Sequence, residues 1–527
     1  MKSIGAHITN LHEGTTYADL YLTALRRRPN NIAMVWSDQA LTYSALLEQI
    51  GKMVAVLKSL GLTKGDTVAH LSYNSPEPIV TWVSCAILGL RYTPLHPIGS
   101  SATDAFCLHK AKVRAVVIDG FNFSERAKNI IKNDNGVAHV LDLSGSGYGT
   151  DLEQLRSLHS PSFVSVEAGV EDVIAIFFTG GTTGEPKGVM HNSRSLVTNA
   201  LVCSAEWDWP KKIDFLAMTP ISHAMGYIVL PILMRGGTVH LRQSFSPKIF
   251  CDAIQEKHTN MTFAVPTMIY AILDMPGIKN VDLSNLEVLI YGAAPISLER
   301  QQQALDLLGP VLFQGYGQTE APNCVTALPR RDHHGKALAS CGRPLAGTTT
   351  RILNQNNVEL PFGEIGEICF RGPLIMAGYL DNPKATEAAT RGGWLHTGDA
   401  GYQDAEGFIY IVDRLKDMII TGGFNVYPKE VEDAIVKLPQ IDDVAVVGTQ
   451  DIHWGEAVCA VIVARKTSAM NAEMVKEHVK KELGSIAAPK YVFVQTDPLP
   501  TTPLGKPDKK QVRQLVADKL HQKFTKP

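Results

Sequence analysis

The sequence lacks the features that mark secreted, membrane-spanning and zinc-binding proteins. A bilayer span needs about 18 uninterrupted apolar residues, and no such stretch occurs; no apolar run follows Lys2 at the start of the chain. The eight cysteines form no C-x-x-C pair. We therefore expect no secretory signal, no transmembrane segment and no structural zinc site. We expect a cytoplasmic protein whose cysteines are buried or free thiols in a reducing compartment.

Charge of neither sign dominates the chain. Lysine and arginine number 50, aspartate and glutamate 52, and the formal net charge is −2. Because duplex-binding proteins usually carry a basic excess, we expect no nucleic-acid partner. Hydrophobic residues make up 45% and charged residues 19% of the 527 residues, which is typical of a globular protein. At roughly 150 residues a domain, this length predicts about three or four compact units.

Helical and strand patterns alternate from about Leu41 to Val325. Thr42 is the expected N-cap of an amphipathic helix that ends near Leu60. Residues 66–71 and 113–119 are predicted strands. Helices that alternate with short apolar strands favour α/β sheets with parallel pairing.

The pattern changes twice toward the C-terminus. From about Thr348, glycine-punctuated strands indicate a smaller, mostly β subdomain, and after Lys416 a new α+β pattern begins. We therefore predict an α/β protein in which residues 1–415 form a large N-terminal domain. This domain contains two α/β sheet subdomains and a β-rich subdomain. Residues 416–527 are predicted to form a small α+β C-terminal domain.

A loop rich in glycine and threonine follows the predicted buried strand 173–178. It reads Thr179-Gly180-Gly181-Thr182-Thr183-Gly184-Glu185-Pro186-Lys187-Gly188. Glycines let successive backbone N–H groups converge on an anion, and a lysine adds a positive charge suited to phosphate. The loop is not a Walker A motif, because Gly188 follows Lys187 where serine or threonine is required. The alternative is a flexible polar turn.

A second glycine-rich segment covers residues 311–320 and is predicted to be a strand followed by a turn. Glu320 stands where a dinucleotide fingerprint would need its third glycine. A carboxylate beside a pyrophosphate is repulsive unless a divalent cation bridges them. Glu320 therefore indicates Mg²⁺ held by substrate phosphates and few protein ligands. The alternative is an ordinary turn from sheet to helix.

A predicted hairpin over residues 400–412 brings Asp399 close to Asp413 and Arg414. An ionised aspartate accepts hydrogen bonds from both hydroxyls of a ribose, and an arginine can donate from the other side. The alternative is a structural ion pair that closes the hairpin.

These motifs, in this order, resemble those of the adenylate-forming superfamily, which includes acyl-CoA synthetases, free-standing adenylation domains and beetle luciferases. The resemblance extends from about Leu41 to Lys510, nearly the whole chain. One departure is Gly180, where the family usually has a serine that supplies a further hydroxyl.

The resemblance implies roles for particular residues. Tyr316 would stack on adenine, Thr319 would contact phosphate, Glu320 would hold the metal, and Asp399 and Arg414 would bind the ribose. The catalytic residues would be Lys506, Lys187, Thr319 and Glu320, with Lys506 a mobile lysine that stabilises charge as the acid attacks ATP. The residues that would bind ATP or AMP are Thr179, Gly180, Gly181, Thr182, Thr183, Gly184, Lys187, Ala293, Ala294, Pro295, Gln314, Gly315, Tyr316, Gly317, Thr319, Asp399, Arg414 and Lys506.

The resemblance also implies a mobile C-terminal domain that turns about Lys416. Residues Gly422, Gly423 and Phe424 would border the tunnel for the pantetheine arm of CoA. The pocket for the acid would be lined by His223, Met225, Gly226, Tyr227, Tyr291, Gly292 and Gly315. Amino-acid-activating relatives carry an aspartate near residues 221–227, and none occurs here, which favours an apolar aryl, alicyclic or fatty acid. For His223 the alternative is a hydrogen-bonded core residue.

The sequence thus predicts a two-step acid–thiol ligase with ATP, Mg²⁺ and CoA, of the kind used in fatty acid metabolism. Carboxylate and ATP give acyl-AMP and pyrophosphate, and CoA then takes the acyl group. One alternative is an amide-forming ligase in which an amine replaces CoA. A second is a catalytically silent nucleotide-binding regulator, against which the presence of Lys187, Glu320, Asp399 and Lys506 argues. We expect a monomer or homodimer.

Overall fold

The computed structural model describes residues 14–132, 136–161, 165–179, 186–256, 258–421, 424–451, 454–465, 470–501 and 507–525. Contacts between residues divide the chain into two compact units. Of the described residues, the first unit holds those within 14–179, 186–350 and 370–395, and the second holds those within 351–369 and 396–525. The two units are described separately below, and a domain boundary at Lys416 stays a prediction.

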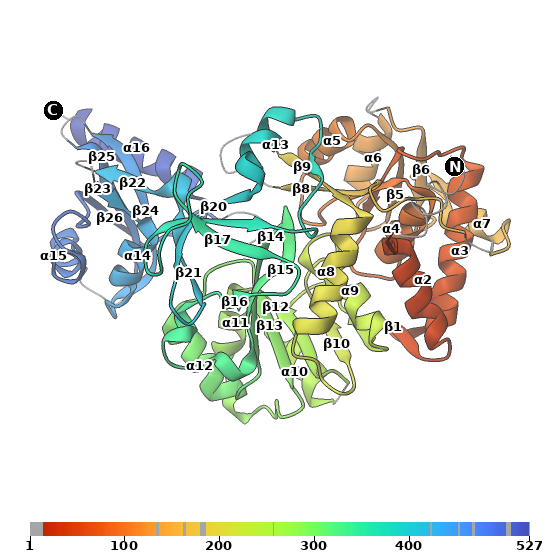
Figure 1. Ribbon diagram of the computed structural model, residues 1–527, viewed down its shortest axis with the longest axis horizontal. Coiled ribbons are helices and arrows are strands. Elements are labelled where there is room, and N and C mark those ends of the chain that lie inside the picture. Colours follow the sequence, from red (N-terminus) through yellow and green to blue (C-terminus); the bar gives the residue numbers. More distant parts are fainter. Residues whose placement is uncertain are drawn as a thin grey trace, which may run out of the picture. The chain divides into compact units, whose positions relative to one another are not determined.

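The first unit contains a sheet whose described strands follow the order β19-β9-β8-β4-β3-β5-β6-β7. Its strands β5, β6, β8 and β9 are labelled in Figure 1. From β8 to β7 every pair is parallel, and β9 runs antiparallel to both β8 and β19. The strands are β3 (Thr67–Leu71), β4 (Arg91–Pro94), β5 (Val113–Ile118), β6 (His139–Asp142), β7 (Thr150–Asp151), β8 (Val173–Thr179), β9 (Lys187–Asn192) and β19 (Gly378–Tyr379). The predicted parallel α/β sheet is confirmed.

A second sheet in the same unit follows the order β16-β15-β14-β13-β12-β10-β11-β1-β2. Its strands from β14 to β1 are parallel, and β15, β16 and β2 add antiparallel edges. The strands are β1 (Ile32–Trp36), β2 (Gln39–Thr42), β10 (Asp214–Ala217), β11 (Thr238–Leu241), β12 (Met261–Ala264), β13 (Val288–Gly292), β14 (Leu312–Gln318), β15 (Ala321–Leu328) and β16 (Arg343–Pro344).

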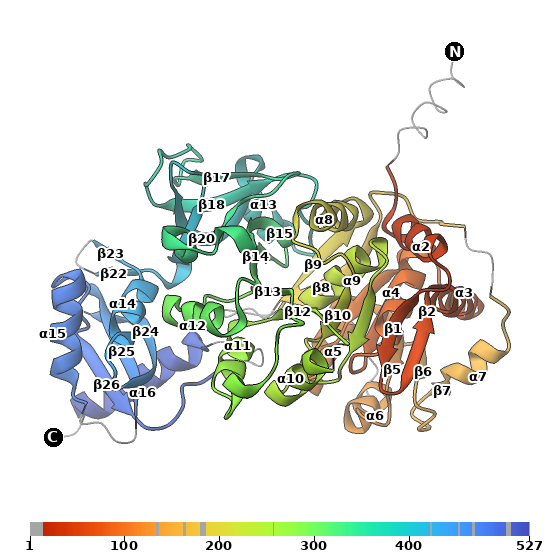
Figure 2. The ribbon, with the colours of Figure 1, turned by 90° about the horizontal axis from the view of Figure 1, so that it is seen from below.

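Helices of the first unit connect and cover these sheets. They are α2 (Tyr17–Arg27), α3 (Tyr43–Ser59), α4 (Glu77–Leu88), α5 (Ser101–Lys110), α6 (Ser124–Lys132), α7 (Leu152–Ser157), α8 (Ser193–Glu206), α9 (Ala224–Met234), α10 (Pro247–Gln255), α11 (Pro266–Leu273), α12 (Leu298–Leu308) and α13 (Pro383–Ala389). In both ribbon views α8 and α9 lie side by side (Figure 2). As predicted, the Thr42 side chain caps α3, accepting a hydrogen bond from the Ala45 amide.

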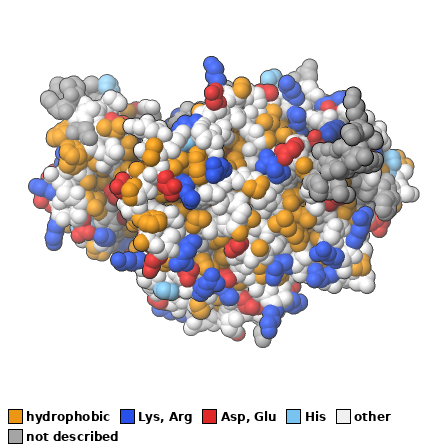
Figure 3. Space-filling model, viewed as in Figure 1, with side chains coloured by type: hydrophobic (Ala, Val, Ile, Leu, Met, Phe, Trp, Pro, Cys, Tyr) orange, Lys and Arg blue, Asp and Glu red, His pale blue; other side chains and the backbone are white. Residues whose placement is uncertain are grey.

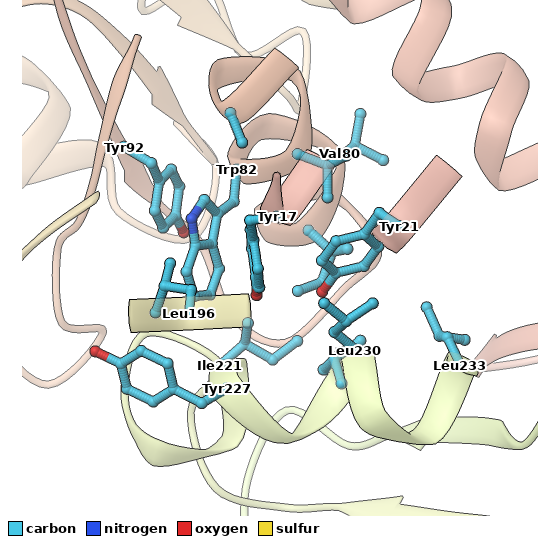
Figure 4. Packing of buried hydrophobic residues seen from close by; sticks show 14 of the residues in the cluster. Tyr17, Tyr21, Val80, Trp82, Tyr92, Leu196, Ile221, Tyr227, Leu230 and Leu233 are labelled. Atoms are coloured by element: carbon cyan, nitrogen blue, oxygen red, sulfur yellow. The ribbon is translucent and has the colours of Figure 1, made fainter. Parts of the chain in front are cut away.

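The core of this unit is built around aromatic side chains of α2, α4, β4 and α9 (Figure 4). The ring of Trp82 stacks on Tyr92 at 5.3 Å between ring centroids and meets the edge of Tyr227 at 5.9 Å. Every residue of α4 from Pro78 to Leu88 is buried, which is why its sequence shows no polar face. In the described part of the chain, no helix has both the length and the apolar character needed to cross a membrane.

Two further sheets consist mainly of residues of the second unit. One follows the order β17-β18-β20-β21, with β17 (Thr349–Leu353), β18 (Gly366–Arg371), β20 (Leu395–Gln403) and β21 (Ile409–Arg414). The other follows the order β23-β22-β25-β24, with β26 paired to β25. Its elements are β22 (Ile419–Thr421), β23 (Phe424–Val426), α14 (Pro428–Val436), β24 (Ile441–Asp451), β25 (Gly455–Ala464), α15 (Ala472–Leu483), β26 (Tyr491–Gln495) and α16 (Lys509–Thr525). The expected β-rich and α+β segments are confirmed.

The mixed surface charge and the buried cysteines agree with what the composition of the sequence predicts. Lysine and arginine side chains are interspersed with aspartate and glutamate over the face shown in Figure 3. The seven cysteines whose side chains the structure describes are buried and form no disulfide.

Candidate active site

The glycine- and threonine-rich loop joins two antiparallel strands. Thr179, the last residue of β8, pairs with Lys187, the first residue of β9, and its hydroxyl donates to the Lys187 carbonyl at 3.4 Å. Gly180, Gly181, Thr182, Thr183 and Gly184 lie outside the described residues. The structure therefore defines the two ends of the predicted phosphate loop, and phosphate binding stays a prediction.

The second glycine-rich segment differs from the expected turn. Strand β14 continues through Gln318, so Gly315 and Gly317 lie within the strand, and the reversal falls at Thr319 and Glu320 before β15 begins. Close strand packing explains Gly317, because a Cβ there would lie 2.6 Å from the Ala321 carbonyl oxygen, and it likewise explains Gly292 of β13, where a Cβ would lie 2.3 Å from the Gly315 carbonyl oxygen. Strands β14 and β15 therefore form a hairpin, and Glu320 lies in its turn.

Lys187 and Glu320 contact the same tyrosine. The Tyr379 hydroxyl donates to Glu320 Oε1 at 2.7 Å, and Lys187 Nζ lies 4.8 Å from the centroid of the Tyr379 ring. Burial, followed by the charge of Glu320, raises the pKa of Tyr379, so its hydroxyl stays protonated and can donate. The structure thus brings together an ammonium and a carboxylate that the sequence places far apart.

His191 connects the same two hairpins. It lies in β9, and its Nε2 is 2.9 Å from the carbonyl oxygen of Thr319, which can only accept, so Nε2 carries the proton. Burial lowers the pKa of His191 to about 4, which keeps the imidazole neutral. Neither His191 nor Tyr379 was predicted. His191 lies shortly after the loop 179–188, whereas Tyr379 follows no motif, and only tertiary packing places these residues beside Thr319 and Glu320.

Helix α9 carries the segment assigned to the acid pocket. His223 precedes the helix, Met225 is fully buried, and the Tyr227 ring packs against Phe177 at 4.9 Å and His191 at 5.8 Å. A Cβ on Gly226 would lie 2.4 Å from the Ile221 carbonyl oxygen, so glycine is needed for the chain to approach there. These residues therefore lie beside the hairpin that bears Lys187.

Tyr291 belongs to a different hydrophobic cluster from Tyr227. Its buried hydroxyl is 3.1 Å from both Gln314 Oε1 and His333 Nε2 and accepts from Gln301 Nε2 at 2.6 Å. This network fixes the end of β13, and a role of Tyr291 in the acid pocket stays a prediction.

The residues assigned to adenine lie on β14 and just beyond β13. Ala293 has a φ of 66°, a left-handed conformation that costs a non-glycine residue roughly 1–2 kcal/mol. Such strained backbone often marks a functional position. The Tyr316 ring meets the edge of Phe370 at 5.9 Å between centroids, and the carbonyl of Glu320 accepts from the Met376 amide at 2.9 Å. Ala294 and Pro295 follow in the same loop, before α12.

In the second unit the predicted proximity of Asp399 and Arg414 is confirmed. They pair directly across the β20–β21 hairpin, with Arg414 Nε 2.7 Å from Asp399 Oδ1. Arg414 also donates to the Thr397 carbonyl at 3.2 Å, and Asp399 is 3% exposed. Asp413 accepts instead from the amides of Arg414 and Lys429, both at 2.6 Å. The ribose-binding role of Asp399 and Arg414 stays a prediction.

A second group of side chains supports the backbone around Asp399. Glu367, Cys369 and His396 place three donor atoms within 4.8 Å of one another, a cluster that cysteine spacing did not reveal. His396 Nδ1 is 2.7 Å from Glu367 Oε2 and 3.3 Å from Cys369 Sγ. The other Glu367 oxygen accepts from the Gly398 amide at 2.9 Å. These contacts brace the turn that carries Asp399.

The expected hinge and tunnel residues are only partly described. Lys416 lies in the 3₁₀ turn η5 (Leu415–Asp417), where burial lowers its pKa, and the neighbouring Asp417 pairs with Arg513 at 2.6 Å. Phe424 begins β23 and is 57% exposed. Gly422, Gly423 and Lys506 lie outside the described residues.

Two family models match the chain. The model for AMP-binding enzymes covers residues 22–380, and that for the AMP-binding enzyme C-terminal domain covers residues 430–506. The chain is 39% identical to the medium/long-chain-fatty-acid–CoA ligase FadD8 of Mycobacterium tuberculosis, over 95% of this chain and 90% of that one. It is 33% identical to feruloyl-CoA synthase of an Amycolatopsis species, over 93% and 96% of the two chains. Its structure resembles that of amide bond synthetase McbA from Marinactinospora thermotolerans with a TM-score of 0.86, 30% identity, and coverage of 94% and 99%.

Proposed function

This chain belongs to the family of AMP-binding enzymes, and we propose that it uses ATP to join a carboxylic acid to CoA. The observation that carries the proposal is the match of both family models, whose ranges include Lys187, Thr319, Glu320 and Lys506. The full-length similarity to two CoA ligases supports CoA as the acceptor.

In the first step, a carboxylate oxygen of the acid attacks the α-phosphorus of ATP. A P–O bond forms to the acid, the bond to pyrophosphate breaks, and acyl-AMP remains. Lys187 and Lys506 would stabilise the negative charge that builds up on the phosphate oxygens, because positioned cations act mainly by such electrostatic stabilisation. Asp399 would accept hydrogen bonds from the ribose hydroxyls while Arg414 donates from the other side.

Glu320 suits a magnesium site. Mg²⁺ is typically bound by one or two carboxylates together with substrate phosphates, and the Tyr379 hydroxyl holds Oε1 of this carboxylate in place. Glu320 would hold Mg²⁺, which when bound offsets the charge of the phosphates.

In the second step, the sulfur of CoA attacks the acyl carbonyl carbon. A C–S bond forms, the C–O bond to AMP breaks, and the thiol proton is released. We assign residues 1–415 to the domain that carries the acyl-AMP and residues 416–527 to a mobile domain that turns about Lys416. Gly422, Gly423 and Phe424 would then border the path of the thiol. The adenylate makes this step possible, because AMP leaves far more readily than the oxygen of a carboxylate.

The acid is proposed to be largely apolar. Met225 and Tyr227 are buried apolar residues of α9, and FadD8, a medium/long-chain-fatty-acid–CoA ligase, is a relative. A place in fatty acid metabolism, a cytoplasmic location and a monomeric or homodimeric state stay predictions.

A second candidate is an amide-forming ligase, which shares the first step and uses an amine as acceptor. The structural similarity to amide bond synthetase McbA favours it. We rank it below the CoA ligase because the sequence relatives at 39% and 33% identity both carry CoA in their names.

A panel assay separates these candidates. The purified protein is incubated with MgATP, a set of aryl, alicyclic and fatty acids, and either CoA or mixed amines, and the products are identified by mass spectrometry. Acid-dependent AMP release is also measured for the variant Lys187→Ala. The matched control is Lys336→Ala, which changes an exposed lysine of η3 (Gly335–Ala339). Acyl-CoA with AMP supports the proposal. Amides alone support the second candidate, and no acid-dependent AMP from any acid contradicts both.

A further inference from the structure

Three side chains with different metal-binding donors converge in the second unit. Glu367 and Cys369 lie in β18, and His396 lies in β20, the strand beside β18 in its sheet. Because Glu367 and Cys369 are two residues apart in a strand, their side chains point to the same face. The carboxylate oxygen, the thiol sulfur and the imidazole nitrogen all lie within 4.8 Å of one another. The three donor atoms therefore face one space.

The spacing of these atoms is close to what a zinc ion requires. His396 Nδ1 lies 2.7 Å from Glu367 Oε2 and 3.3 Å from Cys369 Sγ. Zinc binds nitrogen and oxygen at about 2.0–2.2 Å and sulfur at about 2.3 Å, so the ligand atoms of a tetrahedral ion are about 3.3–3.6 Å apart. Nδ1 and Sγ already have this spacing, and Oε2 would move outward by less than about 1 Å.

The cluster is shielded from water on most sides and open at Glu367. Cys369 is fully buried, the side chain of His396 is 2% exposed, and that of Glu367 is 11% exposed. The second oxygen of Glu367 accepts from the Gly398 amide at 2.9 Å, which turns Oε2 toward the other two donors. An ion, and a water that completes its coordination, would therefore enter beside Glu367.

The combination of donors selects the kind of metal. Mg²⁺ and Ca²⁺ take oxygen ligands, so a site with a thiol and an imidazole is unsuited to the magnesium of MgATP. Zn²⁺ accepts sulfur, nitrogen and carboxylate oxygen, usually four ligands in a tetrahedron. Three protein ligands leave the fourth position to a water molecule.

Cysteine spacing predicts no structural zinc site, because a C-x-x-C pair indicates only ligands that are close together in the chain. His396 is 27 residues from Cys369 and 29 residues from Glu367. The pairing of β18 with β20 brings these residues together. A site assembled across two strands in this way has no local sequence signature.

We propose that Glu367, Cys369 and His396 bind one Zn²⁺ ion, which joins β18 to β20. Sγ, Nδ1 and Oε2 bind the metal. The thiol proton is released to solvent, and the imidazole binds in its neutral form with its proton on Nε2. Since Glu367 also holds the amide of Gly398, the ion would fix the turn that precedes Asp399. The zinc site is distinct from Glu320 and does not depend on the proposed reaction.

The test measures zinc binding by the full-length protein, freed of metal with EDTA and then of EDTA by dialysis. Calorimetric titrations with Zn²⁺ compare the wild type with Cys369→Ser, His396→Gln and Cys459→Ser. Cys459 is a buried cysteine of β25 in the same unit and provides the matched control. The wild type and the control should bind one Zn²⁺ ion at this site. Each ligand variant should weaken this binding by more than the roughly 10- to 100-fold that loss of a supporting partner costs.

Two further readouts identify the ligands without any measurement of activity. Co²⁺ bound to the wild type and to Cys459→Ser should give the charge-transfer absorption of a thiolate–cobalt bond, and Cys369→Ser should lack it. Zn²⁺ should raise the melting temperature of the wild type and of Cys459→Ser, because a ligand of the folded state stabilises it, but not that of Cys369→Ser or His396→Gln.

A wild type that binds no more Zn²⁺ than Cys369→Ser overturns the proposal, and the three side chains are then a hydrogen-bonded group without a metal. A Co²⁺ complex of the wild type without thiolate absorption overturns it as well. Melting temperatures of the metal-free variants exclude misfolding as the cause of lost binding. If one ligand variant does not fold, Glu367→Gln takes its place, because glutamine keeps an acceptor for the Gly398 amide. None of these outcomes bears on the proposed function, since no readout uses ATP or CoA.

Discussion

Replacing Tyr379 by phenylalanine removes one hydroxyl from between the two charged residues of the cluster and leaves the ring. In the structure this hydroxyl donates to Glu320 Oε1 at 2.7 Å, while Lys187 Nζ lies 4.8 Å from the ring centroid. The variant therefore frees the Glu320 carboxylate and keeps the contact between Lys187 and the ring. If Glu320 must be held in place for MgATP to bind productively, the rate of the first half-reaction should fall most.

The size of the effect follows from the kind of bond that is lost. A hydrogen bond to a charged group contributes roughly 1.5–3 kcal/mol, and each 1.4 kcal/mol is about tenfold in rate. Tyr379 is buried, but Glu320 is only half-buried, so we expect the lower part of this range, a loss of about 10- to 50-fold in kcat/KM for MgATP. Tyr379→Leu also removes the cation–π contact, worth about 0.5–1 kcal/mol at such a site, and should cost a further two- to fivefold.

The assay is ATP–pyrophosphate exchange driven by an acid from the panel. Tyr148 offers a matched control, because Lys128 Nζ lies 5.8 Å from its ring centroid on a different part of the first unit. Tyr148→Phe should exchange at the wild-type rate. Exchange by Tyr379→Phe within twofold of the wild type would refute the role of the Tyr379–Glu320 contact. A loss that appears only in acyl transfer to CoA would refute its assignment to the first step.

Three further predictions concern other residues. Lys506→Ala should lower the rate of adenylate formation on the order of 10²–10³ while ATP still binds, as loss of one positioned donor usually does; adenylation near the wild-type rate would remove Lys506 from the catalytic residues. Asp399→Ala should weaken the binding of ATP and AMP, measured by calorimetry, but should weaken the binding of 2′,3′-dideoxy-ATP much less. Equal losses of affinity would mean that the Asp399–Arg414 pair is only structural. Lys416→Pro should leave pyrophosphate exchange largely intact but block acyl transfer, so that acyl-AMP accumulates, because proline fixes φ near −65° at the proposed hinge. Equal loss of both half-reactions with an unchanged melt and ATP affinity, or no loss of either, would contradict the hinge.

The fold was predicted well where local patterns decide it. Alternating helices and strands indicated the parallel sheets, and the predicted hairpin over residues 400–412 brings Asp399 near Asp413 and Arg414. A register shift between Ala400 and Gly401 then sets Arg414, rather than Asp413, directly opposite Asp399. The glycine pattern of residues 311–320 predicts a turn at Gly315 and Gly317, whereas both lie inside β14. Sequence alone does not distinguish a glycine needed for a turn from one needed for close packing between neighbouring strands.

Contacts made by distant segments could not be predicted. Tyr379 and Glu320 are 59 residues apart, and they meet because β19 joins the first sheet beside β9. His96 carried no motif, and its edge-to-face contact with His223 depends on where Arg126 and Asp104 hold the loop after β4. Each of these pairs results from the packing of whole elements, about which a single stretch of sequence carries no signal.

The central claim is that the acid attacks the α-phosphorus of ATP and that CoA then displaces AMP. It is tested most directly by supplying an activated acid whose two carboxylate oxygens are both ¹⁸O, with MgATP and CoA, and by measuring the masses of the AMP and the acyl-CoA. The account predicts one ¹⁸O atom in the phosphate of AMP and one in the thioester carbonyl. Unlabelled AMP, or ADP in its place, would contradict it.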